Sequence, residues 1–194
     1  SNVVTLKVNP LVIPSVNIAA SPSDNICEQS EVKFHATVVN GGNSPSFQWK
    51  KNGIVMGVNS VSYSEFSLKN GDEIVCTVTS KAECLAANQA TSNTIPIKVN
   101  PILTPTVTIS SDAGESACSG KEVIFTAKPV NAGIDPVYQW KKNGKNVGIN
   151  SANYSDKSLV NGDEISCEIT TSAKCYSQKE AASNFIELAV KMCE

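Results

Sequence analysis

The chain has 194 residues, of which 41% are hydrophobic and 6% aromatic, and its formal net charge is −2 at pH 7. Acidic and basic residues are interspersed, so no basic patch predicts a nucleic-acid partner and no polybasic run predicts binding to a membrane surface. No apolar run approaches the ~18–20 residues of a membrane-spanning helix, so membrane insertion is not expected.

Residues 1–9 have the pattern of a strand: Ser-Asn is followed by apolar residues that alternate with polar ones. Residues 92–100 repeat this pattern at the end of a longer segment, and Ser183-Asn184 begins a third copy. We therefore expect residues 1–9 to be a closing-strand-like leader from a preceding repeat. Because one face of such a strand favours burial, residues 3–8 are predicted to pair as an added strand on an edge of repeat 1 or of a neighbouring molecule.

The segment from residue 10 to 100 predicts about seven short strands. Apolar residues alternate with polar ones in several stretches, which is typical of strands with one buried face. The predicted strands start near Val16 and continue over 32–38, 47–51, 54–58, 61–66, 74–78 and 93–99, with turns or loops rich in Gly, Pro, Asn and Asp between them.

The hexapeptide Gln48–Gly53 gives the clearest local prediction. Phe47 and Trp49 lie two residues apart with Gln48 between them, and Asn52-Gly53 is the preferred pair for a two-residue hairpin turn. Trp49 is therefore predicted to lie on a central strand and point into the core, rather than to stack on a sugar at the surface. The same holds for Trp140.

The hexapeptide returns unchanged 91 positions later, with Trp140 in place of Trp49. The same offset relates the cysteines of the two copies, Tyr63 to Tyr154, and an Asn-Gly-Asp corner at 70–72 to one at 161–163. The chain therefore consists of two copies of one module. We predict repeat 1 at residues 10–100 and repeat 2 at residues 101–194. The strand count and spacing predict an all-β fold of two tandem immunoglobulin-like (Ig-like) β-sandwich domains.

These motifs resemble a known family of repeats. The pattern runs from Cys27 through Gln48-Trp49 and Asn70-Gly71-Asp72 to a terminal Ser92-Asn93. It resembles the tandem Ig-like or PKD-like repeats of large surface adhesins and secreted proteins of gliding, Bacteroidota-type bacteria. The resemblance covers residues 10–191 and implies adhesin arms, spacers or accessory modules beside secreted polysaccharide-degrading enzymes. It implies no catalytic residue.

Seven cysteines, three in each repeat plus Cys193, are typical of an exported protein with disulfides. The places of Cys27 and Cys76 in a sandwich favour the pairs Cys27–Cys76 and Cys118–Cys167. The resemblance gives Cys27–Cys84 as an alternative, and a bridge between repeats from Cys27 to Cys175 is a further one. Reduced, buried thiols are another alternative, and the role of Cys193 stays open. No C-x-x-C motif and no spare histidine accompany the cysteines, so structural zinc is not expected.

Two sets of acidic residues could serve as sites. Asp72 and Glu73, which recur as Asp163 and Glu164, could hold a cation or act as an acid/base pair, but a tight corner that Asp caps is favoured. Asp24 with Glu28, or Asp112 with Glu115, could hold calcium, but no EF-hand-like ladder of ligands supports this.

No nucleophile–base pair occurs in either copy, so neither an enzyme nor a cofactor is expected. We predict a non-enzymatic tandem Ig-like segment of an exported cell-surface adhesin that acts as an extended arm or spacer, outside the cell or at its surface. Its partners would be a surface ligand, either a polysaccharide or another protein, and neighbouring repeats of the same chain. The alternative is an accessory carbohydrate-binding module of a secreted polysaccharide-degrading enzyme, for which Phe66 and Tyr176 are the only rings expected to be exposed.

Overall fold

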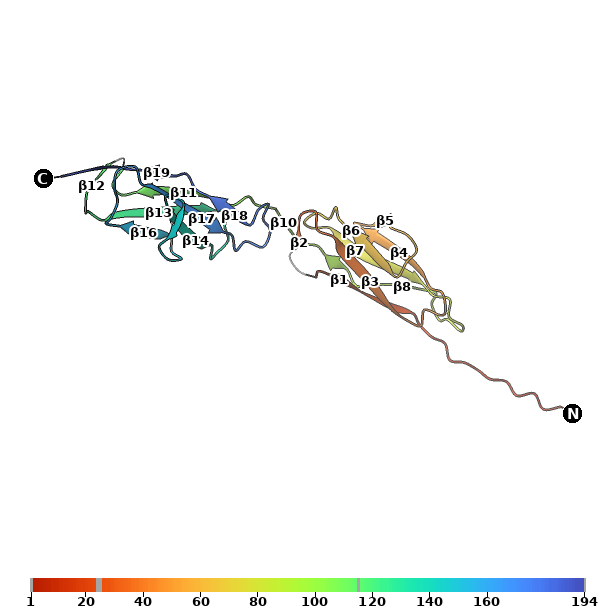
Figure 1. Cartoon of the computed structure of the whole chain (residues 1–194). Helices are drawn as coiled ribbons and strands as arrows, with labels where there is room; N and C mark the ends of the chain where they lie inside the picture. The colour runs from red at the N-terminus through yellow and green to blue at the C-terminus, as the bar shows by residue number, and fades with distance from the viewer. Residues whose placement is uncertain (1, 24–25, 115, 194) are drawn as a thin grey trace. The chain divides into compact units, whose positions relative to one another are not determined.

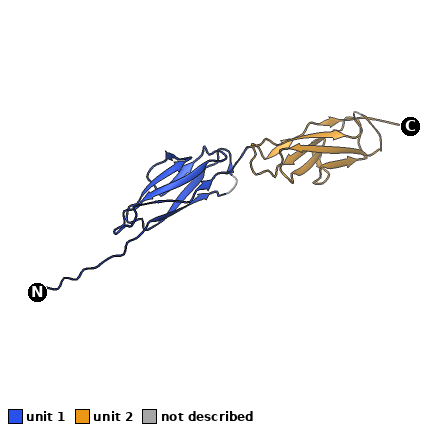
Figure 2. Ribbon diagram, turned by 180° about the vertical axis from the view of Figure 1, so that it is seen from behind, with its two compact units in different colours: residues 1–101 blue, residues 102–194 orange. Residues whose placement is uncertain are grey.

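The chain folds into two all-β units (Figures 1 and 2). A computed structural model describes residues 2–23, 26–114 and 116–193. Unit 1 comprises residues 1–101 and unit 2 residues 102–194. In both units the core lies between a three-stranded and a five-stranded antiparallel sheet, so each unit is an Ig-like β-sandwich. The described residues contain no helix long and apolar enough to span a membrane.

Unit 1 has two sheets and one short parallel pair. The three-stranded sheet has the order β1 (Ser15–Ser21), β3 (Val32–Val39), β6 (Ser62–Glu65). The five-stranded sheet has the order β5 (Ile54–Met56), β4 (Ser46–Lys51), β7 (Glu73–Thr79), β8 (Gln89–Thr91), with β9 (Ile95–Pro96) also on β7. The parallel pair joins β2 (Ile26–Cys27) to β10 (Val99–Asn100).

Unit 2 repeats this topology strand for strand. Its three-stranded sheet has the order β11 (Thr106–Ser111), β13 (Val123–Val130), β16 (Asn153–Asp156). Its five-stranded sheet has the order β15 (Lys145–Val147), β14 (Val137–Lys142), β17 (Glu164–Thr170), β18 (Glu180–Ala182), with β19 (Ile186–Glu187) on β17. Its parallel pair joins β12 (Ser116–Cys118) to β20 (Ala189–Lys191).

The two tryptophans occupy equivalent places in the two cores. Trp49 and Trp140 are fully buried. In unit 1 the indole stacks on Tyr63 at 5.9 Å between ring centroids, and Phe34 packs against both rings. The indole Nε1 donates to the Ser60 carbonyl oxygen at 2.8 Å, so the buried N–H group is satisfied.

The closing strand differs from its prediction. Residues 93–99 do not form one strand, because the chain leaves β7 after Pro96 and pairs next with β2. Between the two pairings, Ile97 exchanges backbone hydrogen bonds with the corner at Gly71 and Asp72. The predicted strand over 61–66 also ends one residue early, and Phe66 is exposed.

A Ser-Asn pair fixes the start of the closing segment in both units. The Asn93 side chain accepts from the Ile18 N–H group at 2.8 Å and donates to the Ile18 carbonyl oxygen at 3.1 Å, so it replaces a backbone partner for β1. Ser92 Oγ accepts from the Cys76 N–H group at 3.0 Å. Ser183 and Asn184 make the same bonds in unit 2.

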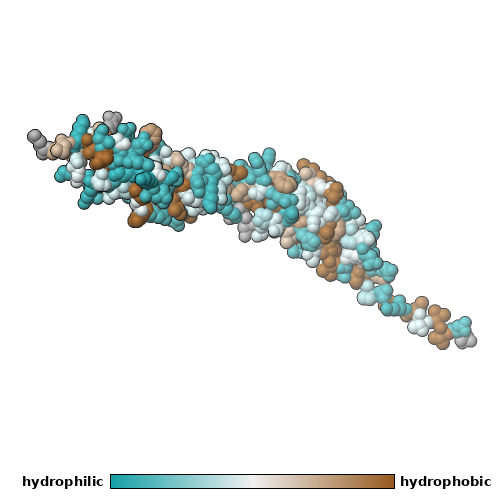
Figure 3. Space-filling view, in the orientation of Figure 1, coloured by the Kyte–Doolittle hydropathy of each residue, from teal (hydrophilic) through white to brown (hydrophobic). Residues whose placement is uncertain are grey.

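The predicted pairing of residues 3–8 with an edge of repeat 1 is wrong for this chain. Residues 2–9 belong to no strand, and the side chains of Val3, Val4, Leu6 and Val8 are exposed, which gives the N-terminal segment its hydrophobic surface in Figure 3. The strands that a closing segment would pair with, β7 and β2, already hold the chain's own β9 and β10. Ser1 lies outside the described residues.

We expect Gly42→Ala to destabilise unit 1 by about 3 kcal/mol. Gly42 has φ 74°, and a Cβ atom there would lie 2.4 Å from the backbone of Lys81 and Ala82. Gly53→Ala is the matched control, because Gly53 also has a positive φ but its Cβ would meet nothing within 4 Å. Its expected cost is about 1 kcal/mol. Urea denaturation measures both, and equal losses would contradict the backbone clash.

Candidate functional site

The predicted disulfide pairs Cys27–Cys76 and Cys118–Cys167 are both wrong. Cys118 is bonded to Cys193, with 5.4 Å between their Cα atoms. Cys76 and Cys167 are buried free thiols. Cys84 is an exposed free thiol, so the alternative pair Cys27–Cys84 does not form either. Cys27 and Cys175 are disulfide-bonded as well.

The sheet register explains why Cys76 and Cys167 stay reduced. Cys76 lies opposite Trp49 on neighbouring strands, and both side chains point into the core between the sheets. Burial raises the pKa of each of the two thiols to about 11. Cys118, by contrast, ends the edge strand β12 beside Lys191, which places Cys193 within reach. The two interior thiols therefore act as apolar core residues.

The acidic pair Asp72 and Glu73 forms a corner cap. Asp72 Oδ2 accepts from the Lys69 N–H group at 2.8 Å, and its Oδ1 accepts from Asn52 Nδ2 at 2.8 Å. Asn52 Oδ1 in turn accepts from the Glu73 N–H group at 2.9 Å. The corner is thereby tied to the β4–β5 hairpin, while the Glu73 side chain faces solvent. Asp163 and Asn143 make the equivalent bonds in unit 2.

A second carboxylate lies beside this corner, and sequence reasoning missed it. Glu65 Oε2 accepts from the Tyr63 hydroxyl at 2.6 Å and lies 3.3 Å from Lys51 Nζ, while Oε1 accepts two bonds from Ser67. In unit 2, Asp156 takes this place with Lys142 and Tyr154. The sequence signal was weak because this position is Glu65 in repeat 1 and Asp156 in repeat 2. The two copies therefore share a carboxylate there but not the same residue type.

The pKa values show that these groups serve the framework. The Tyr63 hydroxyl, then Ser67 and Lys51, lower the pKa of Glu65 to about 2 although burial opposes this. Burial and the neighbouring carboxylate raise the pKa of Tyr154 to about 12. Burial opposes the ionisation of Asp156, but bonds from Ser158, Lys142 and Tyr154 still lower its pKa to about 2. At neutral pH these carboxylates are ionised and the tyrosines protonated, so the network has no group poised for proton transfer.

Acid should therefore weaken both units. Because the folded pKa values of Glu65 and Asp156 lie below their ordinary values of 4.5 and 3.8, each contributes stability above those values that is lost as pH falls toward about 2. The expected loss is on the order of 2–3 kcal/mol per unit. Urea denaturation between pH 7 and pH 2 measures it. Glu65→Gln should reduce this acid dependence in unit 1, where the lowered pKa of Asp72 retains a part of it, and leave it unchanged in unit 2. An unchanged acid dependence of unit 1 in that variant would contradict the assignment.

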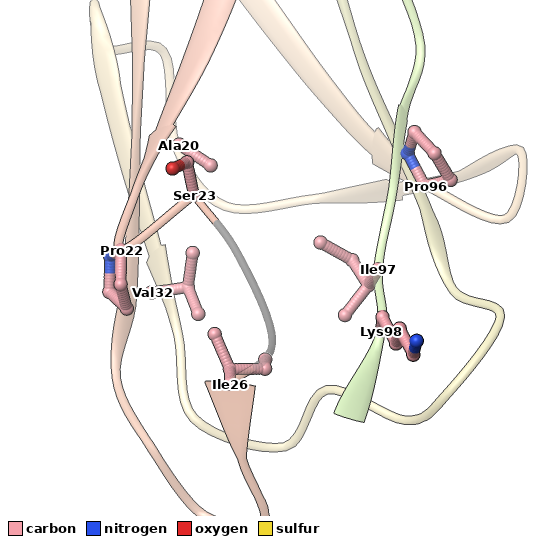
Figure 4. A pocket seen from close by; sticks show the side chains of 8 residues that line it. All are labelled: Ala20, Pro22, Ser23, Ile26, Val32, Pro96, Ile97 and Lys98. Carbon is pink, nitrogen blue, oxygen red and sulfur yellow. The ribbon is translucent and has the colours of Figure 1, made fainter. Parts of the chain in front are cut away.

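The described residues of unit 1 line a pocket of about 290 Å³ with both polar and apolar walls. Ile26, Val32 and Ile97 face one another across it, and Lys98 lies at its side (Figure 4). In unit 2 the residue at the position of Lys98 is Ala189, so the amine is not a feature of the repeat. A pocket of this size lies at the lower limit of small-molecule sites.

The remaining candidates for a metal site find no support. Asp24 and Glu115 lie outside the described residues. Within the part of the chain that the structure describes, no three His, Cys, Asp or Glu side chains gather as metal ligands would. His35 lies on the exposed face of β3, 3.0 Å from Ser62 Oγ.

No protein-family model matches the sequence, and no curated protein matches it. Three N-terminal domains of the highly immunogenic outer capsid protein of bacteriophage RB49 are similar at 11% identity and a TM-score of 0.43, over 91% of this chain and 59% of that chain. Fibronectin(III)-like modules of Clostridium thermocellum CbhA are similar at 15% identity and a TM-score of 0.37, over 90% of this chain and 93% of that chain. The N-terminal four Ig domains of Dscam1 isoform 6.9 are similar at 15% identity and a TM-score of 0.42, over 91% of this chain and 46% of that chain. At these identities and TM-scores, the likenesses carry no argument about ligands or partners.

Proposed function

We propose that this chain is a non-enzymatic segment of tandem Ig-like modules from an exported bacterial cell-surface adhesin, where it acts as an arm or spacer. Disulfide-bonded Ig-like domains are typical of surface and secreted proteins and are normally non-catalytic. The observation that carries the proposal is the polar network at the corner of each module. Most of the ionisable groups with shifted pKa values belong to it, the two buried thiols and Tyr138 being the others, and in both copies its members bond to one another and to the backbone.

This use of the ionisable groups favours a mechanical role over a chemical one. Strongly shifted pKa values often mark active sites, but structural ion-pair networks shift them too. Here Lys51 and Lys142 join a carboxylate to a neighbouring strand in the same way in both units. A site that served one reaction would not need to recur in both modules, whereas a corner that supports the fold does.

The exposed rings argue against a carbohydrate-binding module. Phe66, Tyr176 and Phe185 are 59%, 39% and 66% exposed. Their counterparts in the other repeat are Lys157, Leu85 and Thr94. None of the three exposed rings therefore recurs in both repeats. Phe185 was missed in the sequence because it lies in a stretch predicted to be a buried closing strand.

Replacement of the segment within its parent protein tests the role as an arm. An unrelated pair of Ig-like domains of similar length should restore adhesion of the cells, while deletion without replacement should reduce it. Antibodies against the purified chain should label intact cells. Failure of the unrelated pair to restore adhesion would mean that the segment binds the ligand itself, and labelling only after permeabilisation would contradict the surface location.

The carbohydrate alternative has its own test. Affinity electrophoresis of the purified chain in gels that contain soluble polysaccharides should show no retardation. Retardation that Phe66→Ala, Tyr176→Ala or Phe185→Ala abolishes, with Val130→Ala as a matched exposed control, would favour the carbohydrate-binding module instead.

A further inference from the structure

The thiol of Cys84 differs from every other cysteine of the chain in being both reduced and exposed. Its counterpart in repeat 2 is Cys175, which is 6% exposed and disulfide-bonded. The same position of the module therefore carries a disulfide in one copy and an open thiol in the other. Unit 1 offers Cys84 no partner of its own, because Cys76 is buried in the core and Cys27 is already bonded.

The loop that presents the cysteine is built alike in both units. In unit 1 the Val12 N–H group donates to the Cys84 carbonyl oxygen at 2.8 Å, and the Ala86 N–H group donates to the Val12 carbonyl oxygen at 2.9 Å. In unit 2, Leu103 makes the equivalent bonds with Cys175 and Ser177, at 3.1 and 2.9 Å. Cys84 is therefore held on the same backbone frame as a cysteine that forms a disulfide.

A second cysteine position recurs on the edge strand of each module. Cys27 ends β2 beside Asn100, and Cys118 ends β12 beside Lys191. Cys118 is bonded to Cys193, whose counterpart in repeat 1 is Ile102. Repeat 1 therefore has no counterpart of the cysteine that bonds to Cys118. Cys27 is nevertheless disulfide-bonded as well. The edge-strand cysteine is therefore disulfide-bonded in both repeats, and in repeat 2 its partner lies outside the positions that the two repeats share.

We propose that Cys84 is a covalent docking point for a second copy of this module, and that it forms a disulfide with that copy's edge-strand cysteine, the position of Cys27 and Cys118. The inference rests on the proposed function, since only an array of modules supplies such a partner. Both edge-strand cysteines of this chain are already bonded, so the partner must be a module whose edge-strand cysteine is still open.

The bond needs an oxidant, for which a small-molecule disulfide such as oxidised glutathione suffices. The Cys84 thiolate attacks one of its sulfur atoms and releases one glutathione thiolate, leaving a mixed disulfide on Cys84. The edge-strand thiolate then attacks the Cys84 sulfur and expels the second glutathione. Two protein thiols are oxidised to one disulfide, one glutathione disulfide is reduced to two thiols, and the two protons pass to those thiols.

The test mixes two forms of the full chain, each with one free thiol outside the core. The acceptor is the wild type, in which Cys84 is free and Cys118 is closed by Cys193. The donor is the double variant Cys84→Ser/Cys193→Ser, labelled with ¹⁵N, in which Cys118 is free. After equilibration in a glutathione redox buffer, mass spectrometry counts the three disulfide-linked dimers. We expect the mixed dimer through Cys84 and Cys118 to exceed each symmetric dimer at least tenfold, whereas a statistical ratio of about two would overturn the proposal.

A measurement on the wild type alone covers the case in which the donor does not fold. With no edge-strand thiol open, Cys84 should carry glutathione and form few symmetric dimers in the same buffer. Prevalent Cys84–Cys84 dimers would show that Cys84 pairs with itself and would overturn the proposal. Either of these results would refute the covalent link. The proposed role as an arm would still hold if antibodies label intact cells and unrelated domains restore adhesion.

Discussion

Replacing Trp49 by alanine is expected to lower the free energy of unfolding of unit 1 by about 3–5 kcal/mol. The indole is fully buried, stacks on Tyr63 and packs against Phe34, so its removal leaves a cavity between the two sheets. The Ser60 carbonyl oxygen also loses its hydrogen bond from Nε1. Hydrogen exchange read separately over peptides of each unit measures the loss, and unit 2 should be unchanged.

Phe66→Ala is the matched control for an aromatic side chain of the same unit. Phe66 is 59% exposed and lies outside the core, so we expect a change within about 0.5 kcal/mol. Trp140→Ala should reverse the pattern, with unit 2 weakened and unit 1 unchanged. A loss of protection spread equally over both units by either tryptophan substitution would contradict the separate cores.

Cys193→Ser is expected to cost unit 2 about 4 kcal/mol, because the Cys118–Cys193 bond closes a loop with a sequence separation of 75 residues. Without the bond, the unfolded chain regains the conformational freedom that the closed loop removes. Urea denaturation of unit 2 measures the effect. Substitution is preferred to reduction, because a reductant would also open the disulfides of Cys27 and Cys175.

Cys84→Ser is the matched control for the loss of a thiol. Cys84 is exposed and unbonded in this chain, so the change should lie within about 0.5 kcal/mol. If Cys193→Ser costs no more than Cys84→Ser, the bond does not restrict the unfolded chain as its loop length predicts.

The sequence was sufficient for the framework of each module. Alternating residues such as Phe34 and Ala36 give the inward faces of β3, and the Asn52-Gly53 pair gives the hairpin between β4 and β5. These signals are local, because the side-chain period of a strand and the turn preference of Asn-Gly act over a few residues. The internal repeat then carried each assignment into the other copy.

The disulfides could not be predicted because their geometry is not local. Sequence position placed Cys27 and Cys76 near one end of a sandwich, but not on which face each side chain lies. Trp49 lies opposite Cys76 in the sheet, which places that thiol in the core. Cys193 comes within reach of Cys118 only because β20 runs parallel to β12 rather than continuing along β17. In unit 1 the same switch occurs where the corner at Gly71 and Asp72 holds Ile97, which no short sequence pattern indicates.

The Ser-Asn pair is a motif that the sequence shows clearly but whose role it does not predict. The pair recurs at 92–93 and 183–184. Only the structure shows that the Asn93 side chain takes the place of a neighbouring strand for Ile18, 75 residues away. The carboxylate of Glu65 and Asp156 was harder to find, because its position was shared while its residue type was not.

The bond between Cys118 and Cys193 also decides what happens when the chain is stretched. A pull applied to both ends of unit 2 reaches the two cysteines and crosses from one to the other through the sulfur atoms. The chain between them, which spans a sequence separation of 75 and could reach ~250 Å when extended, therefore bears no tension from this pull and cannot lengthen. Unit 2 therefore lengthens little under load even if its sheets separate. Its refolding then begins from a chain that the disulfide has already closed into a loop.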